Sequence, residues 1–187
     1  MRILPIEPII DATTANRFLL GIIFNQATKA ERAWQAPKII MERLGTNNLK
    51  EIVFMNPEVV EEAVGQYPAV PPFHTQYDRV FLKSCELIIT KYHGDARTIW
   101  TPSCGVYDLI EKLTEFAGIG KHKAIVGIFL LMVELGVTVY DDGSKLDIAK
   151  ECPSLSALYG PFDIPLLTPK PTVKKKKLVH KSTHIWQ

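Results

Sequence analysis

The chain has 187 residues, 47% of them hydrophobic and 22% charged, which is typical of a single globular domain with a sizeable core. Its longest apolar run, Ala124 to Val133, is too short to span a bilayer. The three cysteines show no metal-ligand spacing. These features argue against a membrane protein and against an iron–sulfur or zinc site, and they predict an intracellular protein with reduced thiols.

The net charge of +2 is unevenly distributed along the chain. Six of the 22 basic residues lie in 170–187, which has no acidic residue, so the rest of the chain has 16 basic and 20 acidic residues. A basic tail suggests an anionic partner only weakly, since solvated lysine tails are common. The composition predicts one helical domain over residues 1–160 and a disordered, proline- and lysine-rich tail over 161–187.

Helical spacing of apolar residues recurs along the chain and predicts an all-α protein. A first helix capped by Thr13 or Thr14 should be followed by helices over residues 29–44, 49–54, 58–64, 74–92, 106–116, 121–135 and 145–159. Pro37 should kink the second helix or begin a separate one. No convincing amphipathic strand is present, although Val137 to Tyr140 is briefly extended.

The connection between the helices expected over 106–116 and 121–135 contains Gly118-Ile119-Gly120-Lys121. So short a connection needs a residue at positive φ, which glycine supplies without a Cβ penalty. The second glycine removes a side chain beside the N–H groups that begin the next helix, where a phosphate can bind, and Lys121 can add a charged contact. These residues fit a DNA phosphate site and a plain helical hairpin equally well.

The pattern L-x-x-x-x-G-I-G-x-x-K-A, followed by an apolar helix, resembles the helix-hairpin-helix of the endonuclease III and DNA glycosylase superfamily (HhH-GPD). Three further stretches resemble other parts of the superfamily's sequences and occur in the same order along the chain: Phe24–Thr28, Tyr77–Asp95 and Leu135–Val139. Together with the hairpin, these matches cover about residues 14–142. The chain is most similar to a short branch without the iron–sulfur loop. The resemblance implies a multi-helix bundle, with a truncated second lobe, that binds double-stranded DNA.

Members of this superfamily extrude a damaged or mismatched base and cleave its N-glycosidic bond. The resemblance assigns Gln26 to insertion into the duplex, and it assigns a set of hairpin residues to DNA binding: Gly118, Ile119, Gly120, Lys121 and Lys123. It also implies a catalytic aspartate, for which Asp142 and Asp141 are the candidates. The valine–aspartate pattern of the family is absent here, and paired aspartates before a glycine are equally typical of a solvated turn.

His122 occupies the position at which bifunctional members have the lysine that forms a Schiff base. Lys123 is displaced from that position by about 100° around the helix, so it should point toward the core or a backbone group. A lyase mechanism is therefore not expected, and His122 is interpreted as a residue that lines the pocket. Trp34 and Trp100 are more typical of a core than of base stacking.

The resulting prediction is a monofunctional DNA N-glycosylase that needs no cofactor. Two alternatives remain open. A DNA-binding module that has lost catalysis would explain the departures from the family pattern at the nucleophile and aspartate positions. An N-glycosidase acting on a modified nucleoside or on RNA is compatible with the three lysines and four acidic residues between Val106 and Glu134.

Overall fold

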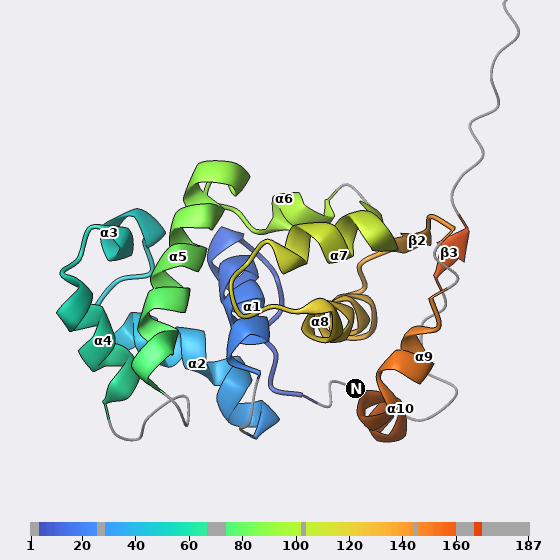
Figure 1. Ribbon diagram of the computed structural model, residues 1–187, viewed down its shortest axis with the longest axis horizontal. Helices are drawn as coiled ribbons and strands as arrows, with labels where there is room; N and C mark the ends of the chain where they lie inside the picture. Colours follow the sequence, from blue (N-terminus) through green and yellow to red (C-terminus); the bar gives the residue numbers. More distant parts are fainter. Residues whose placement is uncertain are drawn as a thin grey trace, which may run out of the picture.

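The computed structural model describes residues 4–25, 29–66, 74–101, 104–143, 146–159 and 167–169. This part of the chain is mostly helical, as predicted (Figure 1). Its helices are α1 (Ala12–Phe24), α2 (Ala30–Arg43), α3 (Leu49–Val53), α4 (Pro57–Gly65), α5 (His74–Tyr92), α6 (Arg97–Trp100), α7 (Val106–Thr114), α8 (Lys121–Val133), α9 (Ile148–Glu151) and α10 (Pro153–Tyr159). Within the described ranges, no helix combines the length and the apolar character that crossing a membrane requires.

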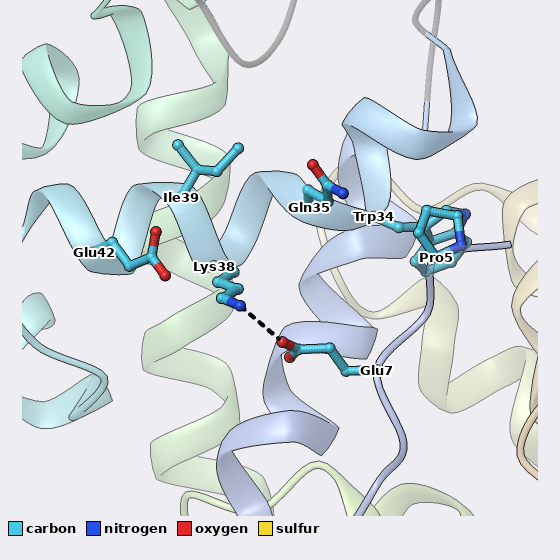
Figure 2. Close-up of a pocket in the computed structure, with 7 residues that line it drawn as sticks. All are labelled: Pro5, Glu7, Trp34, Gln35, Lys38, Ile39 and Glu42. Carbon is cyan, nitrogen blue, oxygen red and sulfur yellow. Dashed lines mark ion pairs between the residues drawn. The ribbon is translucent and has the colours of Figure 1, made fainter.

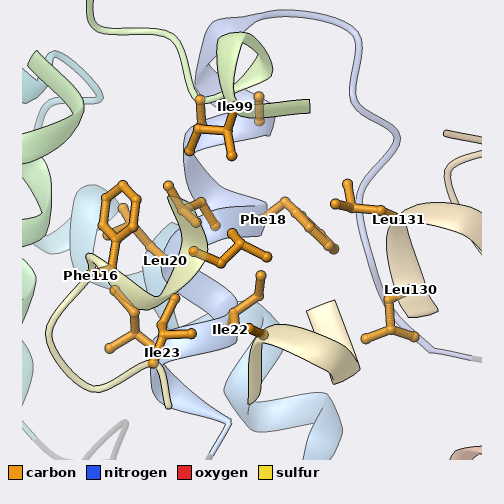
Figure 3. Packing of buried hydrophobic residues seen from close by; sticks show 14 of the residues in the cluster. Phe18, Leu20, Ile22, Ile23, Ile99, Phe116, Leu130 and Leu131 are labelled. Carbon is orange, nitrogen blue, oxygen red and sulfur yellow. The ribbon is translucent and has the colours of Figure 1, made fainter. Parts of the chain in front are cut away.

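The core is built around α1, which packs against α2, α5 and α8 (Figure 1). Every residue of α1 from Phe18 to Phe24 is buried. Figure 3 shows side chains of α1 beside Phe116, which follows α7, and beside Leu131 of α8. Because α1 is apolar on all sides over this stretch, it is stable only with neighbours around it.

The beginning of α1 differs from the expected threonine cap. Asp11 is the N-cap, and its carboxylate accepts a hydrogen bond from the Thr14 N–H at 2.8 Å. The Thr14 hydroxyl oxygen in turn accepts a hydrogen bond from the Asp11 N–H, which completes a capping box. The backbone N–H of Thr14 lowers the pKa of Asp11 most, and the Thr14 hydroxyl, which donates to the same carboxylate oxygen at 2.8 Å, lowers it further. The helix α2 runs through Pro37 without interruption.

The two tryptophans belong to the core. The ring of Trp34 stacks on Phe18 with the centroids 5.4 Å apart, and Trp100 meets the same ring edge-on at 5.9 Å. Both indoles are buried. The structure therefore uses them for packing, the role that the sequence favoured over stacking on a base.

Glycine at position 21 lets the Trp34 ring lie directly on α1. A Cβ atom there would lie 2.6 Å from Cε3 of Trp34, and the ring cannot withdraw because it is buried against Phe18. We expect Gly21→Ala to lower the free energy of unfolding by about 1–3 kcal/mol, the usual cost of overpacking a core. Urea unfolding measures this cost. Gly120→Ala is the matched control, since a Cβ at that position meets nothing within 4 Å. An unchanged midpoint for Gly21→Ala would contradict the close contact.

Short strands accompany the helices. β1 (Cys104–Gly105), β2 (Val139–Asp141) and β3 (Thr168–Pro169) make a parallel sheet in that order. β2 overlaps the stretch Val137–Tyr140 that was expected to be extended, whereas β1 and β3 were not predicted, and two residues of the segment expected to be disordered belong to β3. The predicted helix over 145–159 begins outside the described residues, and its described part is divided into α9 and α10 at Cys152.

All three cysteines are buried thiols. Burial raises the pKa of the Cys85 thiol from 9.0 to about 12, and that of Cys104 and of Cys152 to about 11. Above pH 9 the unfolded chain loses thiol protons that the folded chain retains, so the free energy of unfolding should fall as pH rises from 9 toward these values, by up to about 1.4 kcal/mol per pH unit for each thiol.

Urea unfolding at a series of alkaline pH values measures this decline. The variant Cys85→Ala lacks the thiol with the highest pKa and should show a shallower decline above pH 9 than the wild type. Equal slopes for the two proteins would show that the Cys85 thiol ionises as readily in the folded chain as in the unfolded one.

Candidate nucleic-acid interface

The α7–α8 hairpin closes through a glycine turn. Gly118 has φ +83°, a conformation that favours glycine. The next residue, Ile119, is buried, and its N–H donates to the Phe116 carbonyl at 3.0 Å. Gly120 is the N-cap of α8 in an extended conformation, and a Cβ there would meet nothing within 4 Å. The buried isoleucine anchors the turn, and the exposed glycines leave its outer surface open to a large group. We call Gly118–Lys121 the hairpin turn.

The start of α8 is positive. Its N-cap, Gly120, has no side chain to cap the helix, and its first turn has no acidic residue. Lys121 and His122 are both exposed there. The N–H groups in the first turn of a helix have no acceptor within the helix, and the helix dipole adds positive potential at the same point. This end of α8 can therefore bind an anion through its backbone and through Lys121.

The hairpin turn rests on α1 and α5. A Cβ at Gly118 would lie 3.4 Å from both Cγ2 of Ile23 and Cγ1 of Val80. Lys83, one helical turn beyond Val80, is exposed and shares with Ala117 the lining of a groove of about 270 Å³. Sequence reasoning missed Lys83 as a basic neighbour of the turn, because only the packing of α5 against the hairpin brings the two together.

Lys123 points inward, as the helical geometry predicted. Its ammonium donates to the backbone carbonyl of Ile23 at 2.8 Å, and the side chain is half-buried. Burial lowers the pKa of this lysine. The structure therefore places Lys123 between the hairpin and the end of α1, apart from the exposed Lys121 and His122.

Gln26 lies outside the described residues. The residues just before it are close to the hairpin turn, since the side chain of Ile23 borders Gly118. Phe24 stacks on Tyr77 of α5 with the centroids 5.4 Å apart. The end of α1, from which the chain leads to Gln26, is therefore held between α5 and the hairpin.

The carboxylate of Asp142 caps α7. Its Oδ2 accepts a hydrogen bond from the Tyr107 N–H at 2.9 Å, in the first turn of that helix. It lies against Gly105, where a Cβ would be 2.8 Å from the carboxyl carbon. Its Oδ1 is buried and has no hydrogen-bond partner among the described residues. Asp141 has a different role, because its Oδ1 accepts from the Gly143 N–H at 3.0 Å and closes a local turn.

The structure does not bring His122 and the aspartates together. Asp142 lies at the first turn of α7, whereas His122 lies just beyond the hairpin turn at the other end of that helix. The nine residues of α7 separate these points by roughly 14 Å. Figure 1 shows β2, which leads into Asp142, at the end of the hairpin remote from its turn.

A larger concavity, of about 420 Å³, lies between the N-terminal segment and α2 (Figure 2). It is lined by Pro5, Glu7, Trp34, Gln35, Lys38, Ile39 and Glu42. Lys38 and Glu7 form an ion pair at 3.5 Å, and Glu7 also pairs with Arg17 at 3.1 Å. None of the site residues expected from the sequence lines this concavity.

Comparison of the sequence with protein-family models and with curated proteins found no match. The functional interpretation therefore depends on the geometry of the hairpin and on the residue pattern that resembles the glycosylases.

Proposed function

We propose that this chain binds double-stranded DNA through the α7–α8 hairpin and acts on it as a monofunctional DNA N-glycosylase of the helix-hairpin-helix type. The observation that supports DNA binding best is the hairpin turn itself. It combines a glycine at φ +83°, an open Gly120 at the N-cap of α8 and an exposed Lys121 in the first turn of that helix. A phosphate oxygen can approach such a backbone closely, because a glycine places no side chain of its own over it.

The proposed reaction is hydrolysis of the N-glycosidic bond of an extruded base. His122 cannot form a Schiff base, and the Lys123 ammonium is engaged with the Ile23 carbonyl, so a lysine-dependent lyase step is not part of the proposal. A carboxylate is the remaining group that can stabilise the positive charge developing on the sugar. Asp142 is the stronger of the two candidates, because one of its oxygens has no partner among the described residues.

A second candidate function is DNA binding without catalysis. Two observations favour it: Asp142 is used as a helix cap, and the length of α7 separates it from the hairpin turn. In this case the hairpin would hold DNA and the Asp141–Asp142 pair would serve only local structure.

Incubation of the protein with duplexes that each carry one lesion tests the proposal. Binding of duplex DNA together with release of a base from at least one duplex is the expected result. Binding without release on every duplex would support the second candidate, and failure to bind any duplex would contradict both. Borohydride added during the reaction should trap no protein–DNA adduct, and a trapped adduct would contradict the monofunctional mechanism.

A further inference from the structure

The end of α1 lacks a cationic partner of its own. The last four carbonyl groups of a helix accept no hydrogen bond from an N–H group of the same helix, and α1 has no basic residue in its last turn. Lys123, 100 residues further along the chain, supplies a donor to one of these groups, the Ile23 carbonyl, at 2.8 Å. A cation at this position also interacts favourably with the negative end of the helix dipole.

The same face of α8 makes a second close approach to α1. Gly127 lies one turn beyond Lys123, and a Cβ at Gly127 would be 2.6 Å from Cδ1 of Ile22. Residues four apart lie on one face of a helix, so this face of α8 contacts Ile22 and Ile23 in succession. The Ile23 side chain also borders Gly118. Ile23 is thus held by the hairpin at both its carbonyl and its side chain.

Half-burying an ammonium group has an energetic cost, since burial disfavours the charged form. That cost is visible as the lowered pKa of Lys123. A charge-assisted hydrogen bond to a helix-terminal carbonyl offsets it. The neighbouring Lys121 is exposed, so the two lysines are suited to different tasks.

We infer that Lys123 is a positioning residue, which holds the hairpin against the buried end of α1 and so keeps the hairpin turn in place for DNA. Lys121 contacts phosphate, whereas Lys123 acts through the Ile23 carbonyl and does not touch the DNA. This inference rests on the proposed function, because it assigns Lys123 a part in the same interface. The inference also replaces the direct contact with DNA that the resemblance suggested for Lys123.

The salt dependence of duplex binding separates the two roles. Each phosphate contact that is lost reduces the slope of log K against log salt by about one. Lys121→Met should therefore weaken binding and reduce the slope by about one. Lys123→Met should weaken binding by about tenfold, the usual effect of losing roughly 1.4 kcal/mol, with the slope unchanged. A slope reduced as in Lys121→Met, or an unchanged affinity, would overturn the inference. Lys123→Gln, which retains a neutral donor, should show a smaller loss with the same slope and serves if the methionine variant does not fold.

Amide hydrogen exchange tests the contact in the absence of DNA. In Lys123→Met the amides of residues 22–25 and 118–122 should exchange faster than in the wild type, whereas those of α3 and α4 should not change. Lys121→Met is the control and should leave all of these amides unchanged. Equal exchange in wild type and Lys123→Met would refute the positioning role. Should the wild type bind no duplex, the proposed function fails, and the exchange experiment still decides whether Lys123 couples α1 to the hairpin.

Discussion

Gly120→Glu is expected to abolish duplex binding while leaving the protein folded. A side chain at this position has open space around it, since a Cβ meets nothing within 4 Å, and the backbone has φ −85°. A carboxylate beside the first turn of a helix is favourable for the helix itself. It would nevertheless occupy the anion site and repel the DNA phosphates, so we expect an affinity loss of at least about a hundredfold, or roughly 3 kcal/mol.

Gly120→Gln is the matched control for this variant. It has the size and shape of glutamate without the charge, so it should lose much less affinity and should show how much of the effect is steric. Fluorescence anisotropy with a labelled duplex measures the affinity, and thermal unfolding checks the fold. Full affinity in Gly120→Glu would show that the protein binds DNA through a surface other than the hairpin turn.

Asp142→Asn is expected to slow base release strongly without weakening duplex binding. An asparagine oxygen can still accept the hydrogen bond that the Tyr107 N–H donates to Asp142 Oδ2, so the cap on α7 should survive. The negative charge, which the proposed reaction needs, is lost. General acid–base and charge-stabilising groups usually contribute about 10²–10⁴ in rate, and a loss in this range is expected in single-turnover base release.

Asp141→Asn is the natural comparison, because its carboxylate serves a turn through the Gly143 N–H and asparagine forms such turns equally well. It should retain base release. Undiminished release by Asp142→Asn would remove this residue from the reaction, and a protein that binds duplexes but never releases a base would be the non-catalytic module.

The parts of the fold that follow local rules were predictable. The bounds of α5, residues 74–92, follow from its long amphipathic pattern, and the helix ends before two residues at positive φ, His93 and Gly94. The inward direction of Lys123 followed from its angular displacement from position 122. In each case the residues involved are close in sequence, so the pattern carries the information.

The parts that depend on distant segments were not predictable. The strands of the sheet have two or three residues each, which is too few for an alternation of apolar and polar residues to be recognised. Their partners lie far away in the sequence, so no local pattern predicts the pairing. The role of Asp142 as a cap of α7 depends on the pairing of Cys104 with Val139 and of Gly105 with Tyr140. The position of Lys83 beside the hairpin turn likewise results from tertiary packing alone.

The β1–β2 pairing has a consequence for how the hairpin meets a ligand. The two helices are joined by the hairpin turn at one end, and at the other end the strands that flank them pair, with Asp142 bonded to the first turn of α7. Because the two helices are connected at both ends, they should keep their relative position when a ligand binds. The hairpin is therefore preorganised and loses little conformational entropy on association. The heat-capacity change of DNA binding should accordingly be that of two rigid surfaces meeting, without the large negative contribution that accompanies coupled folding.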